Sequence, residues 1–365
     1  MECASEIYDR SEYLRCLNKK MTQQRVPVSG SIELTRSCNL KCIHCYLGRS
    51  SKDSNKVKLE LNTSQWKQVI DEITEAGCLF LLMTGGELFL RNDFIEIYTY
   101  AKQKGLLITL FTNGTLISDE IVNHFKKYPP SAIEITVYGS TPETYERITG
   151  SKAAYHQCIR NINKLLDNQI RVKIKTILMK PNRHEFFDIK QMAKFYDVGF
   201  RSDACIFGCF DGNKAPLSLR VPAKAAVDME MADEKKIHSW TDFYHRMKDV
   251  KPDKTLFQCG AGVTNFHIDA YGNLQPCLIS THMKYNIFQD GGFVKGWKDL
   301  MLKIREEKAS GDILLCNQCE KRLFCGYCPA FFALETGSEN QRADYLCEIG
   351  KYRYEKIINH HSAEL

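Results

Sequence analysis

The stretch TRSCNLKCIHCY, from Thr35 to Tyr46, decides how the fold of this chain is interpreted. It spaces Cys38, Cys42 and Cys45 as C-x3-C-x2-C and places an aromatic residue directly after the last cysteine. A structural zinc site takes four protein ligands, often from two C-x2-C pairs. Here the first gap is three residues and no fourth cysteine follows nearby, so the stretch offers three thiolates where four are usual.

The composition is that of an ordinary globular protein, with one exception. The 365 residues are 44% hydrophobic and 26% charged, and the net charge of +6 is spread along the chain, which gives no case for nucleic acid binding. The exception is cysteine, with 16 residues. There is no signal peptide and no apolar run of about 18 residues. We therefore expect a cytoplasmic protein without a membrane span, whose cysteines bind metal.

Short β-rich runs alternate with amphipathic helical stretches from Gly30 onward. Six runs rich in Ile, Val and Leu, joined by five helices, predict a parallel sheet with right-handed crossovers. Six units are too few for an eight-stranded barrel, so we expect an α/β fold built as a partial (β/α)6 TIM-like barrel. The predicted strands are 31–36, 79–85, 106–114, 132–139, 171–179 and 200–207, and the predicted helices are 63–77, 92–105, 119–128, 154–169 and 184–197.

In such a sheet, ligands bind at the carboxyl ends of the strands. The informative residues of this chain fall at those ends, strand by strand: Cys38 after the first, Gly85, Gly86 and Glu87 after the second, Thr112 and Asn113 after the third, and Thr136 to Gly139 after the fourth.

The three-cysteine loop after the first strand resembles the signature of radical S-adenosylmethionine (SAM) enzymes. Iron–sulfur clusters are held by cysteine thiolates, so three thiolates leave one iron of a 4Fe–4S cubane open. The resemblance implies that the amine and carboxylate of SAM bind this iron. It also implies that the reduced cluster cleaves SAM to methionine and a 5′-deoxyadenosyl radical, which abstracts hydrogen from a substrate. A zinc loop is the alternative.

The other strand ends fit the same resemblance. Gly85-Gly86-Glu87 is similar to the family's G-G-E motif, which binds the methionyl amine of SAM, although Leu88 stands where the family usually has Pro. Glycines allow close backbone approach, and a carboxylate suits an ammonium group. The resemblance implies further SAM contacts from Tyr46, Thr112, Asn113, Thr136, Tyr138 and Arg147. Arg147 could equally be a surface arginine of a helix, and the family more often has Ser and Asp near Thr136.

A second group of cysteines lies near the C-terminus and, taken alone, resembles a zinc ribbon. Between its first two members, Tyr271-Gly272-Asn273 predicts a tight hairpin turn. In context it is similar to the SPASM extension of radical SAM enzymes, which holds two auxiliary 4Fe–4S clusters. The resemblance implies an outer cluster on Cys316, Cys319, Cys325 and Cys347 and an inner one on Cys259, Cys277 and Cys328. The inner set lacks a fourth cysteine, so Cys205, Cys209, a carboxylate, water or substrate would complete it. We therefore expect three 4Fe–4S clusters in all.

These features divide the chain into five parts: an N-terminal extension at 1–28, a radical SAM core at 29–210, a helical linker at 211–255, a SPASM domain at 256–350 and a tail at 351–365. SPASM enzymes mostly modify peptides, so we expect a maturase that crosslinks or epimerises a ribosomally made peptide. Leu278 argues against the sulfatase maturases, which carry Asp there. A modifier of haem precursors and a non-enzymatic iron–sulfur or zinc scaffold are the alternatives.

The sixth strand supplies the candidate catalytic residues. Asp203 could accept a proton during crosslinking, and Cys205 or Cys209 could donate a hydrogen atom in an epimerase; an ordinary pair of Arg201 with Asp203 and two core cysteines are the alternative. Fewer than forty residues precede Cys38, too few for the leader-binding domain of many relatives. We therefore expect a peptide with a leader presented by a separate PqqD-like chaperone, and a flavodoxin or ferredoxin as reductant.

Overall fold

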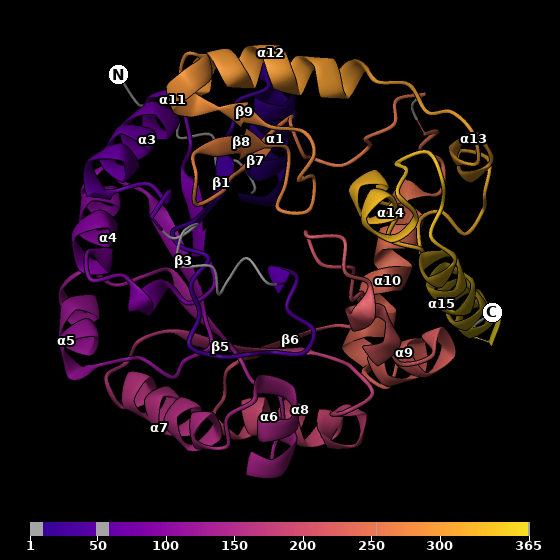
Figure 1. Ribbon diagram of the computed structural model, residues 1–365. Helices are drawn as coiled ribbons and strands as arrows, with labels where there is room; N and C mark the ends of the chain where they lie inside the picture. Colours follow the sequence, from indigo (N-terminus) through magenta and orange to yellow (C-terminus); the bar gives the residue numbers. More distant parts are fainter. Residues whose placement is uncertain (1–9, 49–57, 253, 364–365) are drawn as a thin grey trace, which may run out of the picture.

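The structure is a computed structural model that describes residues 10–48, 58–252 and 254–363. A curved sheet is surrounded by helices, and the loop after the first strand lies in the middle of the ring (Figure 1). The six parallel strands of the barrel are β1 (Ser29–Glu33), β2 (Phe80–Thr84), β3 (Leu107–Thr112), β4 (Ala132–Thr136), β5 (Val172–Ile177) and β6 (Gly199–Asp203). The helices between them are α3 (Thr63–Glu75), α4 (Phe94–Gln103), α5 (Asp119–Lys127), α6 (Pro142–Thr149), α7 (Ala153–Asp167) and α8 (Phe186–Phe195).

The strand order is β6-β5-β4-β3-β2-β1-β7-β8-β9, so the sheet is open and the predicted partial barrel is confirmed. The three added strands are β7 (Asn265–Ile268), β8 (Asn273–Gln275) and β9 (Tyr285–Asn286). β7 pairs in parallel with β1, whereas β7–β8 and β8–β9 are antiparallel. The C-terminal hairpin expected around Gly272 therefore extends the sheet of the barrel.

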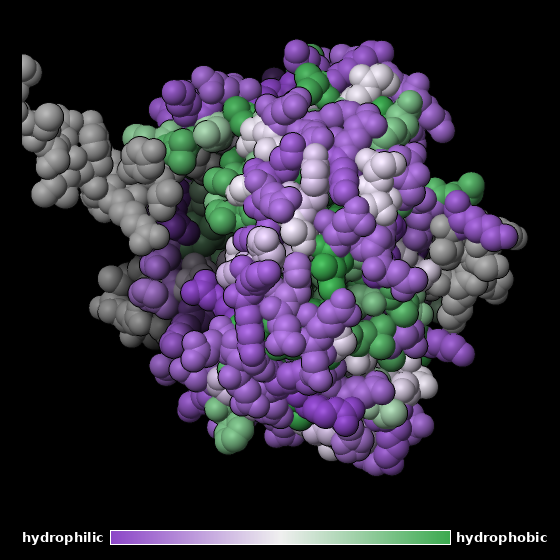
Figure 2. Space-filling model, turned by 90° about the vertical axis from the view of Figure 1, so that its left-hand side faces the viewer, coloured by the Kyte–Doolittle hydropathy of each residue, from purple (hydrophilic) through white to green (hydrophobic). Residues whose placement is uncertain are grey.

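Apolar periodicity explains why the barrel helices pack where they do. In α3, Trp66, Val69, Ile70 and Ile73 are fully buried, which is the spacing of one helix face. Asn62 caps this helix, because its side chain accepts from the Gln65 amide while the Gln65 side chain accepts from the Asn62 amide. The left-hand side of the molecule in Figure 1 faces the viewer in Figure 2. The outward surface there is mainly hydrophilic, with hydrophobic residues in small patches (Figure 2).

The remaining helices flank the two ends of the sheet (Figure 1). α9 (Ala223–Glu230), α10 (Glu234–Met247), α14 (Pro329–Thr336) and α15 (Asp344–Ala363) lie beyond β6, while α1 (Arg10–Gln24), α11 (Ile287–Asp290) and α12 (Phe293–Glu306) lie near β7–β9. The short α13 (Ile313–Cys316) precedes the cysteine cluster. The expected tail from residue 351 is the continuation of α15, and no helix in the described ranges is long and apolar enough to cross a bilayer.

Candidate functional site

The loop that carries Cys38, Cys42 and Cys45 is held against the end of β2 by main-chain hydrogen bonds. Gly86 donates to the Thr35 carbonyl at 2.7 Å, and Glu87 donates to the Ser37 carbonyl at 2.8 Å. A Cβ on Gly86 would lie 2.2 Å from the Ser37 carbonyl oxygen, and one on Gly85 would lie 2.4 Å from that of Thr35. Only glycine fits this approach, so the pair fixes where the cysteine loop begins.

The far side of the loop is anchored at α6. The amide of Lys41 donates to Thr149 at 2.9 Å, and that of Ile43 donates to Ile148 at 3.0 Å. The three cysteines therefore lie on a segment that is hydrogen-bonded at its start and in its middle to two different elements of the barrel.

Asn113, after β3, connects the cysteine loop with the neighbouring strand. Its side-chain amide donates to Asn39 at 2.9 Å and approaches the Cys38 sulfur at 3.9 Å, while its carbonyl oxygen accepts from the amide and hydroxyl of Thr115. Because both ends of the Asn113 amide are engaged, its N–H group is aimed at the sulfur. This orientation suits a sulfur that carries negative charge.

Glu87 is fully buried and closes the network from β2. Its carboxylate accepts from the Thr112 hydroxyl at 2.8 Å, from the Asn113 amide at 2.8 Å and from the Phe89 amide at 3.3 Å. Burial raises the pKa of Glu87 to about 6, although these hydrogen bonds oppose the rise. The carboxylate thus positions Thr112 and Asn113, and the expected contact with an ammonium group stays a prediction.

The thiols of the loop lie close enough to influence one another. Burial raises the pKa of Cys38 to about 11, and the charges of Glu87 and Cys45 add to the rise. Burial and the charges of Cys45 and Cys38 likewise raise the pKa of Cys42. Such thiols lose their protons only when a cation takes their place, as happens on metal binding. The donor set therefore fits a positively charged group with sulfur affinity.

The three cysteines of the loop can be compared with what a single ion and a cluster each require. Among the residues that the structure describes, no three Cys, His, Asp or Glu side chains form a group that could hold one metal ion. A cubane binds each thiolate at a different iron, so its cysteines need not converge on one point. The residues that would hold the cluster are Cys38, Cys42 and Cys45.

The aromatic residue after the loop packs against the segment that follows β6. The ring of Tyr46 lies 4.9 Å from that of Phe210 and 5.8 Å from that of Phe207, and the Phe210 amide donates to the Tyr46 carbonyl. The Cys209 thiol donates to the Cys45 carbonyl at 3.4 Å. Of the two candidate hydrogen donors, Cys209 is therefore brought to the cysteine loop.

The other two candidates near β6 have different surroundings. Asp203 is exposed and accepts from the Cys205 amide at 2.8 Å, whereas burial raises the pKa of Cys205 to about 12. Tyr345 of α15 lies within electrostatic reach of both groups. The ordinary alternative of an Arg201–Asp203 pair is wrong, because the Arg201 guanidinium lies 3.3 Å from Glu134 instead.

The residues predicted to contact SAM after β4 lie in different surroundings, some buried and one exposed. Thr136 and Tyr138 are buried, and the Tyr138 ring lies 5.2 Å from that of His44. Arg147 lies exposed in the last turn of α6, with no ion pair among the described residues. The structure therefore groups Tyr138 with the cysteine loop and leaves Arg147 at the surface of α6.

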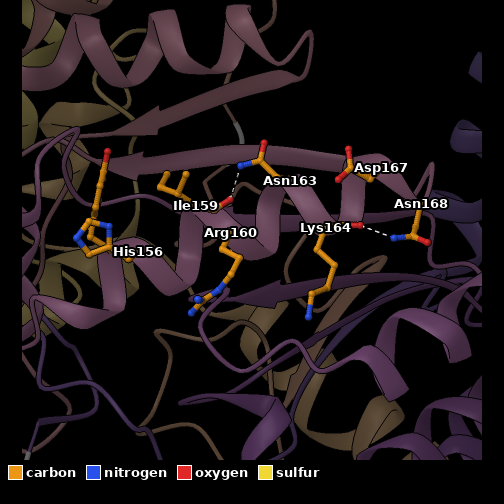
Figure 3. Close-up of a pocket in the computed structure, with 8 residues that line it drawn as sticks. His156, Ile159, Arg160, Asn163, Lys164, Asp167 and Asn168 are labelled. Carbon is orange, nitrogen blue, oxygen red and sulfur yellow. Dashed lines mark hydrogen bonds between the residues drawn. The ribbon is translucent and has the colours of Figure 1, made fainter.

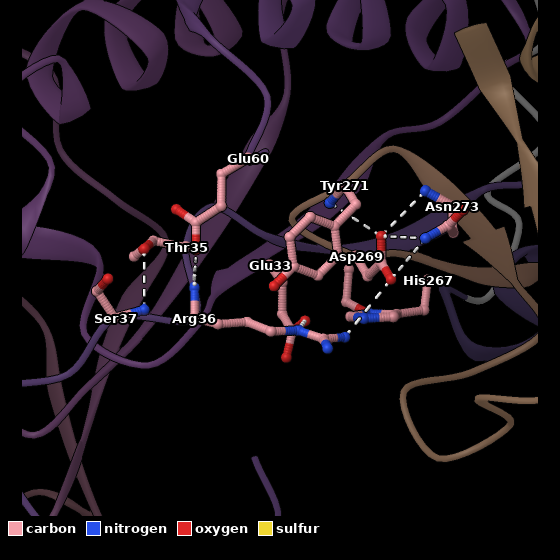
Figure 4. Close-up of polar contacts among 10 residues, drawn as sticks. Glu33, Thr35, Arg36, Ser37, Glu60, His267, Asp269, Tyr271 and Asn273 are labelled. Atoms are coloured by element: carbon pink, nitrogen blue, oxygen red, sulfur yellow. Dashed lines mark hydrogen bonds and ion pairs between the residues drawn. The ribbon is translucent and has the colours of Figure 1, made fainter. Parts of the chain in front are cut away.

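A residue that the sequence did not single out, Arg36, joins the loop to the C-terminal hairpin (Figure 4). Its guanidinium donates to Glu33 at 3.1 Å and to Asp269 at 3.5 Å, and it lies 4.9 Å from the Tyr271 ring. Asp269 in turn accepts from the Tyr271 and Asn273 amides at 3.0 Å. Burial raises the pKa of Glu33 to about 7 despite Arg36. The cysteine loop and the β7–β8 turn therefore form one polar network.

The C-terminal cysteines fall into two sets in space. Burial, and after it the charges of Cys277 and Cys259, raise the pKa of Cys328 to about 12, so these three thiols lie near one another. The Ser280 hydroxyl, itself fully buried, lies 3.5 Å from the Cys277 sulfur.

The second set lines a cavity of about 390 Å³ made by Cys316, Cys319, Cys325 and Cys347. The charged side chains of its lining are Lys321, Arg322, Arg342, Lys351 and one carboxylate, Glu348, so the lining carries a net positive charge. Four thiols in a cavity with this positive balance suit a closed 4Fe–4S cluster, whose thiolates bring negative charge. By contrast, the pocket along α7 is lined by residues between Tyr155 and Asn168 and by no cysteine (Figure 3).

Comparison with known proteins agrees with this geometry. Residues 32–193 match the radical SAM superfamily. The antilisterial bacteriocin subtilosin biosynthesis protein AlbA of Bacillus subtilis is 28% identical over 334 residues, which cover 89% of this chain and 72% of that protein. An AdoMet-dependent heme synthase of Methanosarcina barkeri is 33% identical over 162 residues, only 44% of this chain and 46% of that protein.

Among solved structures, Streptococcus suis SuiB bound to the precursor peptide SuiA shares the fold. It superposes with a TM-score of 0.66 at 15% identity, over 93% of this chain and 82% of that one. The likeness therefore extends beyond the barrel into the C-terminal cysteine region.

Proposed function

We propose that this enzyme modifies a ribosomally made peptide by radical chemistry, with SAM and a 4Fe–4S cluster bound in the region that matches the radical SAM superfamily, residues 32–193. The modification would be a thioether or carbon–carbon crosslink, or an epimerisation. The observation that carries the proposal is the three-cysteine loop, fixed between Gly85-Gly86 and Asn113, in a chain whose likeness to AlbA covers 89% of its length.

When bound, the cluster and SAM together supply a 5′-deoxyadenosyl radical that abstracts a hydrogen atom from the substrate. The residues of this chain hold and orient that chemistry. Gly85 and Gly86 bring the β2 end against the loop, and Glu87 fixes the Asn113 side chain that approaches Cys38. Asp203 would accept the proton that a crosslinking step releases, and Cys209, beside Cys45, is the better placed hydrogen donor for epimerisation.

The C-terminal cysteines would hold two auxiliary clusters that accept or return the electron of the substrate radical. Cys316, Cys319, Cys325 and Cys347 provide a complete set, whereas the inner set has three thiols with Ser280 beside Cys277. A PqqD-like chaperone, a flavodoxin or ferredoxin as reductant and a cytoplasmic location complete the proposal.

The second candidate is modification of a haem precursor, which the heme synthase likeness favours. That likeness spans 44% of this chain, while the likeness to AlbA reaches 89%. The peptide function therefore accounts for more of the molecule.

The test is anaerobic incubation of the reconstituted protein with SAM, dithionite and a precursor peptide encoded beside its gene. We expect 5′-deoxyadenosine, and a peptide that is lighter by two hydrogens for a crosslink or deuterium-labelled in D₂O for an epimer. No 5′-deoxyadenosine would contradict the radical chemistry. Turnover of an iron porphyrin precursor with an unchanged peptide would replace the peptide function by the haem alternative.

A further inference from the structure

The inner face of the barrel carries charged residues that the functions above do not use. Along β5, Val172, Ile174 and Thr176 are buried on one face, while Lys173, Lys175 and Ile177 alternate on the other. Side chains of one strand alternate between the two faces of a sheet. Since the buried set packs under the helices, Lys173 and Lys175 belong to the concave side of the sheet.

A contact across the barrel confirms this placement for Lys175. Its ammonium lies 3.2 Å from the centre of the Phe111 ring on β3, and the Arg201 guanidinium on β6 lies 5.3 Å from the same ring. β3 and β5 are two strands apart, about 9–10 Å at ordinary strand spacing, so their side chains meet in this way only on a concave face. Lys175 and Arg201 therefore converge inside the barrel.

The Lys175 ammonium has no anionic partner there. Glu134 is shared by Lys173 at 3.6 Å and Arg201 at 3.3 Å, and Lys175 makes no hydrogen bond or ion pair with any residue that the structure describes. Glu87, the other nearby carboxylate, is occupied by Thr112, Asn113 and Phe89. The charges of Glu134 and Glu87 both act on Lys175, but no ion pair joins either carboxylate to its ammonium among the described residues. Three cations thus face two carboxylates, and both carboxylates already have other partners. The Phe111 ring compensates this ammonium only in part, and a bound anion would offset the remaining cost of its burial.

The site can be reached from solvent and lies near the carboxyl ends of the strands, within electrostatic reach of Glu87. The Arg201 side chain is 59% exposed at the open edge of the sheet, whereas Lys175 is partly buried deeper inside. In the strand register Lys175 pairs with Thr136, the last residue of β4, so it lies one step below the strand ends that face the cysteine loop. Burial, with Arg201 adding to it, lowers the pKa of Lys175 to about 7, and an anion bound there would raise it again.

We propose that Lys175 and Arg201 form a subsite for a carboxylate of the peptide substrate, which positions the modified residue in the barrel. Lys175 and Arg201 are register partners on β5 and β6 and approach the same Phe111 ring. An ammonium and a guanidinium placed side by side are donors that pair strongly with carboxylates. The carboxylate is that of an Asp or Glu side chain or that of the peptide C-terminus. This inference rests on the proposed peptide function and names the chemistry that its substrate must carry.

The experiment measures binding of small probes to the anaerobically reconstituted holoenzyme by saturation-transfer NMR. N-acetyl-glutamate N-methylamide presents a side-chain carboxylate, N-acetyl-glycine presents a C-terminal carboxylate, and N-acetyl-glutamine N-methylamide is the neutral control. SAM affinity and 5′-deoxyadenosine formation without peptide are measured on the same samples. The variants are Lys175→Met and Lys175→Gln, with Lys173→Met as the matched control, because Lys173 shares the strand and the face but already pairs with Glu134.

We expect the wild type to bind one carboxylate probe at least about tenfold more tightly than the neutral probe. Both Lys175 variants should lose that preference, Lys173→Met should keep it, and SAM affinity should stay within about twofold in all three. Whichever carboxylate probe shows the preference identifies its source. The proposal is overturned if the Lys175 variants keep the preference, or if neither carboxylate probe is preferred.

An equal loss of SAM affinity in the Lys175 variants would also overturn it, since the carboxylate would then be that of SAM. Unchanged 5′-deoxyadenosine formation in these variants separates a failure of the subsite from a failure of the proposed radical chemistry. Iron content and circular dichroism establish that each variant is folded. The Gln variant keeps a polar side chain at position 175 and so controls for altered packing in the Met variant.

Discussion

The loop after β1 and the cavity before α15 both contain several cysteines, but they differ in the number of thiols and in the groups around them. The loop has three thiols, and glycine, amide and carboxylate groups fix it from β2, β3 and α6. The cavity has four thiols, and its lining includes four basic side chains and one carboxylate. An incomplete set on a rigid frame leaves a coordination position for a small molecule, whereas a complete set leaves none. On the proposed function, the number of thiols distinguishes the site that binds SAM from the site that transfers electrons.

The largest effect that we predict for this comparison comes from a substitution in the cysteine loop. Cys42→Ala removes one of three thiolates, and we expect 5′-deoxyadenosine formation from SAM and dithionite to fall to background, with about four irons per chain lost. Mass spectrometry and iron assay measure both quantities. Cys16→Ala, on the exposed side of α1, is the control and should change neither. Retained SAM cleavage in Cys42→Ala would show that another cysteine set does the chemistry.

A smaller effect comes from the link between the loop and the C-terminal hairpin. Arg36→Met leaves Glu33 and Asp269 buried without their partner, so we expect the free energy of unfolding to fall by about 3–5 kcal/mol. The loss should be smaller at pH 5.5 than at pH 8, because Glu33, whose pKa is raised to about 7, becomes protonated. Urea denaturation at the two pH values measures this. Adding Glu33→Gln should restore part of the stability, and a cost independent of pH would argue against the network.

The smallest effect concerns Lys175. Its folded-state pKa of about 7 lies below the ordinary value of 10.5, so the folded protein binds fewer protons between these values and stability rises with pH across that window. Lys175→Met removes this dependence. At pH 7 it should be more stable than the wild type by roughly 1–3 kcal/mol after allowance for solvent screening, with the gain fading toward pH 10. Urea midpoints measure the gain, and a destabilised Lys175→Met protein would contradict it.

Much of the fold could be predicted from local patterns. The six strands, five of the barrel helices and the turn at Gly272 follow from periodicity, capping residues and glycine, which act over a few residues. The pairing of β7 with β1 could not be predicted, because a strand's partner is chosen by packing between residues more than 200 positions apart. The short helix α6 was also missed, although Thr141, Pro142 and Gly150 are ordinary start and stop residues.

The candidate site shows the same division. The spacing of Cys38, Cys42 and Cys45 and the glycines after β2 could be recognised in the sequence. Cluster binding and close backbone approach need particular residue types at fixed separations along the chain. The roles of Lys175 and Arg36 could not be predicted from the sequence. A lysine at alternate positions of a strand has the pattern of a solvent-facing residue, and an arginine next to a motif has no pattern that indicates a partner. Only the curvature of the sheet and the added hairpin show what these two residues face.

The most direct test of the account is electron paramagnetic resonance of reduced protein with and without SAM. The first variant keeps the cysteines of the loop and has Ala in place of the seven C-terminal cysteines, which are Cys259, Cys277, Cys316, Cys319, Cys325, Cys328 and Cys347. The second variant keeps these seven and has Ala in place of Cys38, Cys42 and Cys45. We predict that SAM changes the cluster spectrum of the first variant and leaves that of the second unchanged. A spectrum that responds to SAM only when the C-terminal cysteines are present would contradict the account.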